Sequence, residues 1–168
     1  MNGAHLHLII NHSPIYAAIF GFLILLIGII KKSQAIKNIG LLLFVIMALA
    51  TIPTFLSGER SPKIVREMPG VTRAYIHEHA EAGLYALYSA EILGALALLT
   101  LILSRRAAKA PQWLYVLCLL LSLAVNAIMV RTANLGGEIR HTEIRPDFQP
   151  ADPSVIPGNP EKPEVQPK

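Results

Sequence analysis

The sequence predicts an all-α integral membrane protein, a four-helix bundle followed by a Pro-rich C-terminal tail. Of its 168 residues, 53% are hydrophobic and only 15% are charged. With a mean hydropathy of +0.48, the chain is too apolar for a soluble domain of this length. Apolar runs occur four times; the first two are close to the roughly 20 residues that a membrane-spanning helix needs, and the last two are longer. Charge, proline or glycine bounds every run, so the runs predict four separate spans.

The four predicted spans cover about 14–31, 38–57, 77–104 and 111–135. The first two form a helical hairpin across a short basic loop, and the last two form a second hairpin. Together they make a membrane domain over residues 1–145, followed by a tail over residues 146–168. The tail is rich in proline and mixed charge, and it has too little apolar content to fold alone. We therefore expect an extended segment outside the membrane.

The basic residues indicate how the spans are oriented. The loops after the first and third spans contain no acidic residue, whereas the connection between the second and third spans mixes both signs. The positive-inside rule places the two basic loops in the cytoplasm and both termini outside, on the periplasmic side of a bacterial inner membrane. The basic residues of the two loops are Lys31, Lys32, Lys37, Arg105, Arg106 and Lys109. They flank apolar runs instead of forming one basic face, which argues against a nucleic-acid partner despite the net charge of +4.

All six histidines fall at one end of the predicted bundle. Odd-numbered spans begin at this end and even-numbered spans finish there, so the clustering follows from topology. The six are His5, His7, His12, His77, His79 and His141. Imidazole is the commonest protein ligand for haem iron, copper and zinc, so the cluster predicts a metal site. The alternative is that these rings are simply solvated at a wet membrane interface.

Helical periodicity separates the histidines further. His79 begins a stripe of small residues that includes Gly83, which leaves room for the edge of a porphyrin or for tight helix packing. The sequence favours His12, His79 and His141 as ligands, with His7, His77 and His5 as supporting or solvated groups. Arg140 is a candidate partner for haem propionates.

Four polar residues interrupt the apolar spans. Glu91 and Asn126 lie at similar depth in the third and fourth spans and are expected to hydrogen-bond, either in a proton relay or as a link between two helices. Nearer the outside, Glu81 and Arg131 are expected to form a structural ion pair.

The two ends of the membrane domain resemble a known family. The segment from His7 to Pro14 (HLIINHSP) is similar to the HPxxVHFP start of an uncharacterised family of bacterial four-helix membrane proteins. The segment from Leu135 to His141 (LGGEIRH) is similar to that family's LGGxxxxRH ending. The resemblance implies a four-span fold with His7, His12 and His141 as signature positions, and it implies no activity.

Three functions remain open at this stage. The first is a membrane redox protein that binds b-type haem and exchanges electrons with quinol or an exterior partner. The second is a copper or zinc protein using the His-x-His pairs at 5–7 and 77–79. The third is a non-catalytic accessory subunit of a respiratory or other membrane complex. A single cysteine, Cys118, excludes a disulfide framework and a CxxCH haem attachment.

Overall fold

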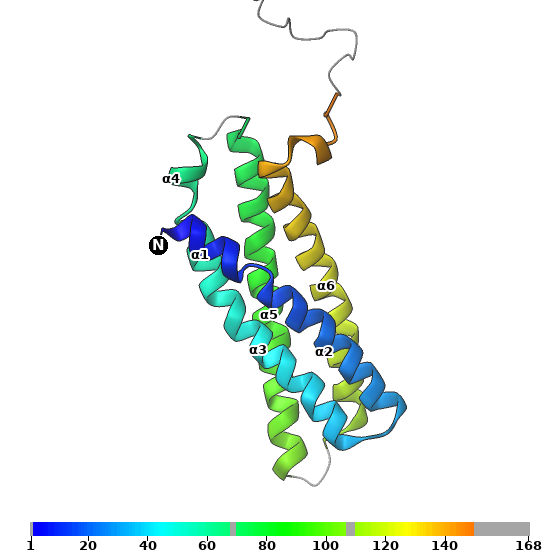
Figure 1. Cartoon of the computed structure of the whole chain (residues 1–168). Coiled ribbons are helices and arrows are strands. Elements are labelled where there is room, and N and C mark those ends of the chain that lie inside the picture. Colours follow the sequence, from blue (N-terminus) through cyan, green and yellow to red (C-terminus); the bar gives the residue numbers. More distant parts are fainter. Residues whose placement is uncertain (1, 68–69, 107–109, 150–168) are drawn as a thin grey trace, which may run out of the picture.

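The computed structural model describes residues 2–67, 70–106 and 110–149. Four long apolar helices pack as a bundle, which confirms the predicted all-α fold (Figure 1). In chain order the elements are α1 (Gly3–Ile10), α2 (Ser13–Ile30), α3 (Gln34–Glu59), α4 (Pro62–Val65), α5 (Arg73–Arg106), α6 (Gln112–Arg140) and the 3₁₀ turn η1 (Thr142–Ile144).

The helices run alternately up and down around the bundle. Helix α2 packs against α3 and α6, and α5 packs against the same two helices from the other side. One end carries α1, α4, the start of α5 and the end of α6, and we call it the histidine end (Figure 1). The other, the loop end, carries the turn between α2 and α3. All four long helical segments have the length and hydropathy of membrane spans. The chain is therefore a multi-pass membrane protein.

The first span consists of two helices instead of one. Helix α1 ends at Ile10, and α2 begins at Ser13 with Pro14 in its first turn. Proline lacks a backbone N–H and its ring crowds the preceding turn, so a helix breaks before it. Beyond the break, α1 packs against α3 and α4. Both helices of this span therefore lie along α3, and α1 also contacts α4.

The helices extend beyond the predicted apolar runs. Helix α5 begins at Arg73 instead of near residue 77, and α6 continues to Arg140 instead of ending near residue 135. Polar residues form helix readily once outside hydrocarbon, so hydropathy marks only the apolar part of a helix. These extra turns of α5 and α6 carry polar side chains, among them Tyr75, Glu138 and Arg140, at the histidine end.

Packing at the centre combines large and small side chains. Phe44, Met47 and Leu93 are almost fully buried, while large residues such as Phe20 and Ile92 point outward. An outward apolar surface suits lipid chains, which solvate it in place of water. At the loop end a polar cluster joins three helices: Gln34 Nε2 donates to the Tyr115 hydroxyl at 2.7 Å and to Asn38 Oδ1 at 2.8 Å, and Ser104 Oγ donates to Asn38 Oδ1 at 3.3 Å.

The two hairpins repeat one another in their pattern of burial. Each of five buried residues in α2 has a buried counterpart in α5 that lies 72 positions later. These are Pro14, Ala18, Gly21, Leu25 and Gly28, matched by Ala86, Ala90, Leu93, Ala97 and Thr100. Five buried residues of α3 likewise match buried residues of α6 that lie 78 positions later. These are Lys37, Gly40, Phe44, Met47 and Thr51, matched by Tyr115, Cys118, Ser122, Val125 and Met129. The bundle is thus two equivalent hairpins about an approximate twofold axis that runs along it.

Candidate functional site

His7 and His79 meet at the histidine end. His7 comes from α1 and His79 from α5, and their ring centroids lie 6.2 Å apart with an angle of 77° between the ring planes. Both side chains are half-buried. The pair therefore joins the first helix of one hairpin to the first helix of the other.

A backbone carbonyl holds each ring by the same nitrogen. His7 Nδ1 lies 2.9 Å from the Thr54 carbonyl oxygen of α3, and His79 Nδ1 lies 3.0 Å from the Thr132 carbonyl oxygen of α6. Because a carbonyl oxygen only accepts, each Nδ1 must carry a proton and donate it. In the neutral rings this leaves the lone pair on Nε2. Orientation of an imidazole through Nδ1–H is the usual arrangement behind a metal-binding Nε2.

A glycine lies against each ring. A Cβ added to Gly58 would lie 3.1 Å from His7 Cε1, and one added to Gly136 would lie 2.9 Å from His79 Cε1. Contacts this short mean that a side chain at either position would displace the adjacent imidazole ring. Each imidazole is fixed both by its hydrogen bond and by the backbone beneath it.

The carbonyl and glycine that contact one imidazole correspond to those that contact the other. In each hairpin the carbonyl comes from a threonine and the contact from a glycine four residues later, Thr54 with Gly58 and Thr132 with Gly136. The second threonine and glycine lie 78 positions after the first, as the burial pattern requires. Sequence reasoning missed these residues. The signal was a repeated order of elements, in which a His-x-His pair is followed by a Thr-x-x-x-Gly segment.

The other histidines lie outside this pair. His12 is exposed at the start of α2, where its ring stacks on Tyr16 with 6.2 Å between centroids. His141 is exposed after α6, and its Nδ1 lies 2.9 Å from Glu143 Oε1. His5 and His77 are also exposed. The structure thus brings together His7 and His79, of which the sequence favoured only His79 as a ligand.

Two residues expected beside a cofactor lie near the same end. Gly83 is half-buried on α5, and a Cβ added there would meet only Phe55, at 4.0 Å. This position therefore has room for at least a methyl group, whereas Ala82, Ala86 and Ala90 on the same helix face are buried by helix packing. Arg140 is exposed in the last turn of α6.

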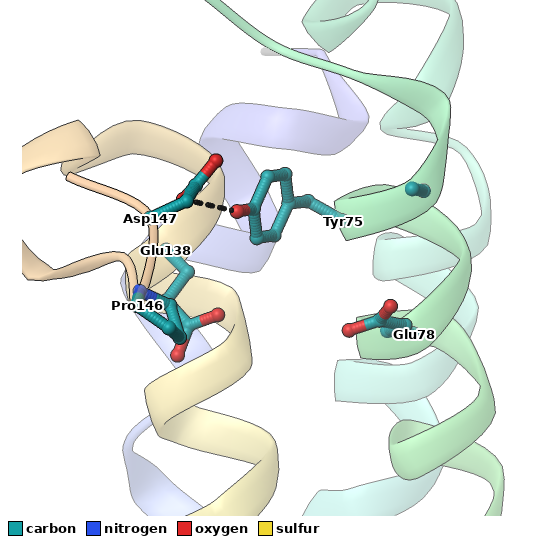
Figure 2. A pocket seen from close by; sticks show the side chains of 6 residues that line it. Tyr75, Glu78, Glu138, Pro146 and Asp147 are labelled. Carbon is teal, nitrogen blue, oxygen red and sulfur yellow. Dashed lines mark hydrogen bonds between the residues drawn. The ribbon is translucent and has the colours of Figure 1, made fainter.

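An acidic hollow of about 340 Å³ lies at the histidine end, between α5, α6 and the segment after η1. Glu78 and Glu138 face it from the two helices, and Asp147 accepts a hydrogen bond from the Tyr75 hydroxyl at 3.0 Å (Figure 2). Arg145 contacts two of the lining residues: its guanidinium lies over the Tyr75 ring at 4.3 Å, and its Nε donates to the Glu138 carbonyl at 2.8 Å. These contacts anchor the described part of the tail to the bundle.

The polar residues of the spans lie apart from one another. Asn126 Nδ2 donates to the Ala18 carbonyl of α2 at 3.4 Å and to the Ser122 carbonyl at 2.8 Å. Glu91 lies instead in a groove between α3 and α5. The expected hydrogen bond between Glu91 and Asn126 is absent among the described residues, because their acceptor atoms Oε1 and Oδ1 both lack a partner. Glu81 and Arg131 are both exposed and form no ion pair within the described ranges.

The donor set at the histidine pair is small. Across the part of the chain that the structure describes, no three His, Cys, Asp or Glu side chains come together as metal ligands. The pair therefore offers two imidazole nitrogens and no further side-chain donor. No protein-family model, curated protein or solved structure matches the chain. The site must be interpreted from its own chemistry.

The contact between His141 and Glu143 predicts a local response to pH. Hydrogen bonds from the Glu143 backbone N–H and from the His141 side chain lower the pKa of Glu143 below its ordinary value. The ionised Glu143 carboxylate therefore stabilises η1 at pH values above the pKa of this group in the unfolded chain. The stabilisation is lost as the pH falls through the lower pKa of Glu143 in the folded chain. In an NMR titration, Glu143 should titrate below the ordinary glutamate pKa of about 4.3. The variant His141→Ala should move the pKa part of the way back, and an unchanged pKa would contradict the contact.

Proposed function

We propose that the protein is a membrane electron carrier that binds b-type haem through His7 and His79 at the exterior end of the bundle. The observation that carries the proposal is the pair of neighbouring imidazoles, in edge-to-face contact and each held through Nδ1 by a backbone carbonyl. Both Nε2 atoms are left with a lone pair, and the two rings come from opposite halves of the repeat.

The number of donors favours haem iron. A structural zinc site takes four protein ligands, and this pair supplies two. A porphyrin brings four nitrogens of its own, so haem iron needs only two axial ligands from the protein. Two metal–imidazole bonds of about 2.0 Å place the ring centroids about 6 Å apart when a metal lies between the Nε2 atoms. The observed 6.2 Å is compatible with that separation.

Two further residues near the pair support the haem proposal. Gly83 leaves open space on α5, and Arg140 is a cation for a propionate at the end of α6. Bound haem would supply one-electron chemistry, while this chain orients the two ligands and sets the exposure of the group. The basic loops orient the histidine end towards the periplasm of a bacterial inner membrane. Quinol, an exterior redox protein or a respiratory complex is the class of partner that such a carrier needs.

Copper is the second candidate, because the same separation also suits a bare ion held between two Nε2 atoms. The absorption spectrum of the detergent-purified protein distinguishes the two. Haem gives a Soret band and split α and β bands on reduction, and about one haem per chain is expected. If metal analysis finds copper or zinc and those bands are absent, the haem proposal is overturned. His7 and His79 then remain the proposed ligands, but of a metal ion. If neither is present, the protein fits the accessory-subunit hypothesis instead.

A further inference from the structure

A groove halfway along the bundle contains an acidic side chain without a partner. Glu91 lines it together with apolar residues of α3 and α5, and the hollow holds about 230 Å³. Its other lining residues are Val45, Ala48, Leu49, Gly94, Ala95 and Leu98. Glu91 Oε1 is buried against the protein and accepts no hydrogen bond among the described residues. Among the lining residues Glu91 alone has a polar side chain, and the other walls of the groove are apolar.

The position of Glu91 places this groove inside the hydrocarbon. Glu91 is separated from Arg73 and from Arg106, the two ends of α5, by about 27 Å and about 22 Å of helix. Water does not solvate a polar atom at that depth, so an unpaired carboxyl group there is costly unless something else bonds to it. That partner must come from the membrane and must reach a narrow hollow.

We propose that this groove binds the headgroup of a membrane quinone or quinol, with Glu91 as its hydrogen-bonding partner. A protonated carboxyl donates to a quinone carbonyl, and an ionised carboxylate accepts from a quinol hydroxyl. One side chain thus serves both redox forms of the same ligand. The isoprenoid tail of a quinone extends along the apolar walls of the groove. The use of the site as an electron entry point rests on the proposed function, whereas the binding itself does not.

The walls and the depth argue against other occupants. Transmembrane helices associate through small residues that permit close approach. Small residues do line this groove, namely Ala48, Gly94 and Ala95. Leu49 and Leu98 share it, however, and the neighbouring Tyr88 and Ile92 are large and exposed, so a second helix would meet bulky side chains beside the small ones. Phospholipid headgroups stay at the membrane surface, whereas Glu91 lies near the middle of α5. A ring that bears carbonyl or hydroxyl groups on a lipid-soluble molecule fits both conditions.

The test is the binding of decylubiquinone, oxidised and reduced, to the full-length protein in phosphatidylcholine nanodiscs, with empty nanodiscs as background. We expect saturable binding of one quinone per chain. Glu91→Leu should weaken binding by about tenfold or more, because it removes the hydrogen-bonding group. Glu91→Gln keeps a donor and an acceptor and should retain binding of the oxidised form within about threefold. Equal binding to wild type and Glu91→Leu would overturn the proposal.

A matched pair of variants separates filling of the groove from a general change in the surface. Ala95→Phe fills the hollow and should abolish binding, whereas Ala124→Phe places the same ring on the exposed face of α6 and should not. If a cholesterol analogue competes as well as the quinone, the groove binds lipid-soluble rings in general and the quinone proposal is contradicted. A chemical crosslink between the Ala95→Cys positions of two copies would also contradict it, because a second copy would then cover the groove. His7→Ala should leave quinone binding unchanged. The haem and quinone proposals can therefore fail separately.

Discussion

Replacing either His7 or His79 with alanine is expected to abolish the Soret absorption of the purified protein. In the proposed haem site His7 and His79 would be the two protein ligands, and each ring is held by an equivalent carbonyl and contacts an equivalent glycine. With only one of the two imidazoles left, the chain would not retain haem through purification, so haem content should fall at least tenfold. The approximate twofold repeat predicts that the two variants behave alike.

Matched controls exist in the same chain. His12 and His141 are exposed and lie outside the pair, so His12→Ala and His141→Ala should retain the wild-type spectrum and haem content. A thermal unfolding curve for each variant verifies that the bundle is intact. If haem is retained in His7→Ala but lost in His12→Ala, the ligands favoured by the sequence are supported and the pair of His7 and His79 is rejected.

Gly40→Ala is expected to destabilise the first hairpin. A Cβ at this position would lie 2.7 Å from the backbone nitrogen of Leu25 and 2.8 Å from its Cα. Backbone atoms of a packed helix cannot turn aside as a flexible side chain can, so α2 and α3 must separate along their contact. Overpacking of this kind costs about 2 kcal/mol and outweighs the better helix propensity of alanine, about 1 kcal/mol.

The comparison that tests this is Gly83→Ala. Its added Cβ meets only Phe55 at 4.0 Å, an ordinary contact, so this change should be neutral or slightly stabilising. Both variants are unfolded reversibly with sodium dodecyl sulfate in mixed micelles, using cofactor-free protein. Equal free energies of unfolding for the two variants would contradict the close approach of α2 and α3.

Much of the fold could be predicted because lipid leaves the chain few choices. A chain with four apolar runs of spanning length must form helices there, since no water is available for unpaired backbone groups. The two basic loops and the clustering of six histidines at one end follow from the same topology. The prediction was least accurate at the helix ends, where α5 and α6 continue into polar sequence that hydropathy does not register.

Which two histidines lie next to each other could not be predicted, because it depends on how the helices are rotated and tilted. The depth of a residue in the membrane follows from its position along a helix at about 1.5 Å per residue. Depth alone led to the expected hydrogen bond between Glu91 and Asn126, which the structure does not contain among the described residues. The structure turns Asn126 towards α2 and Glu91 towards α3. Likewise, the contact between His7 and His79 depends on the packing of α1 against α3, which the local sequence does not specify.

By itself the sequence determined an all-α membrane bundle of four spans with every histidine at one end, because apolar length and chain direction are local properties that lipid enforces. Only the tertiary structure decided that His7 and His79 lie next to each other. Their acceptors, the carbonyls of Thr54 and Thr132, lie 47 and 53 positions away in sequence. Contacts across such distances depend on the packing of whole helices, which no single segment specifies.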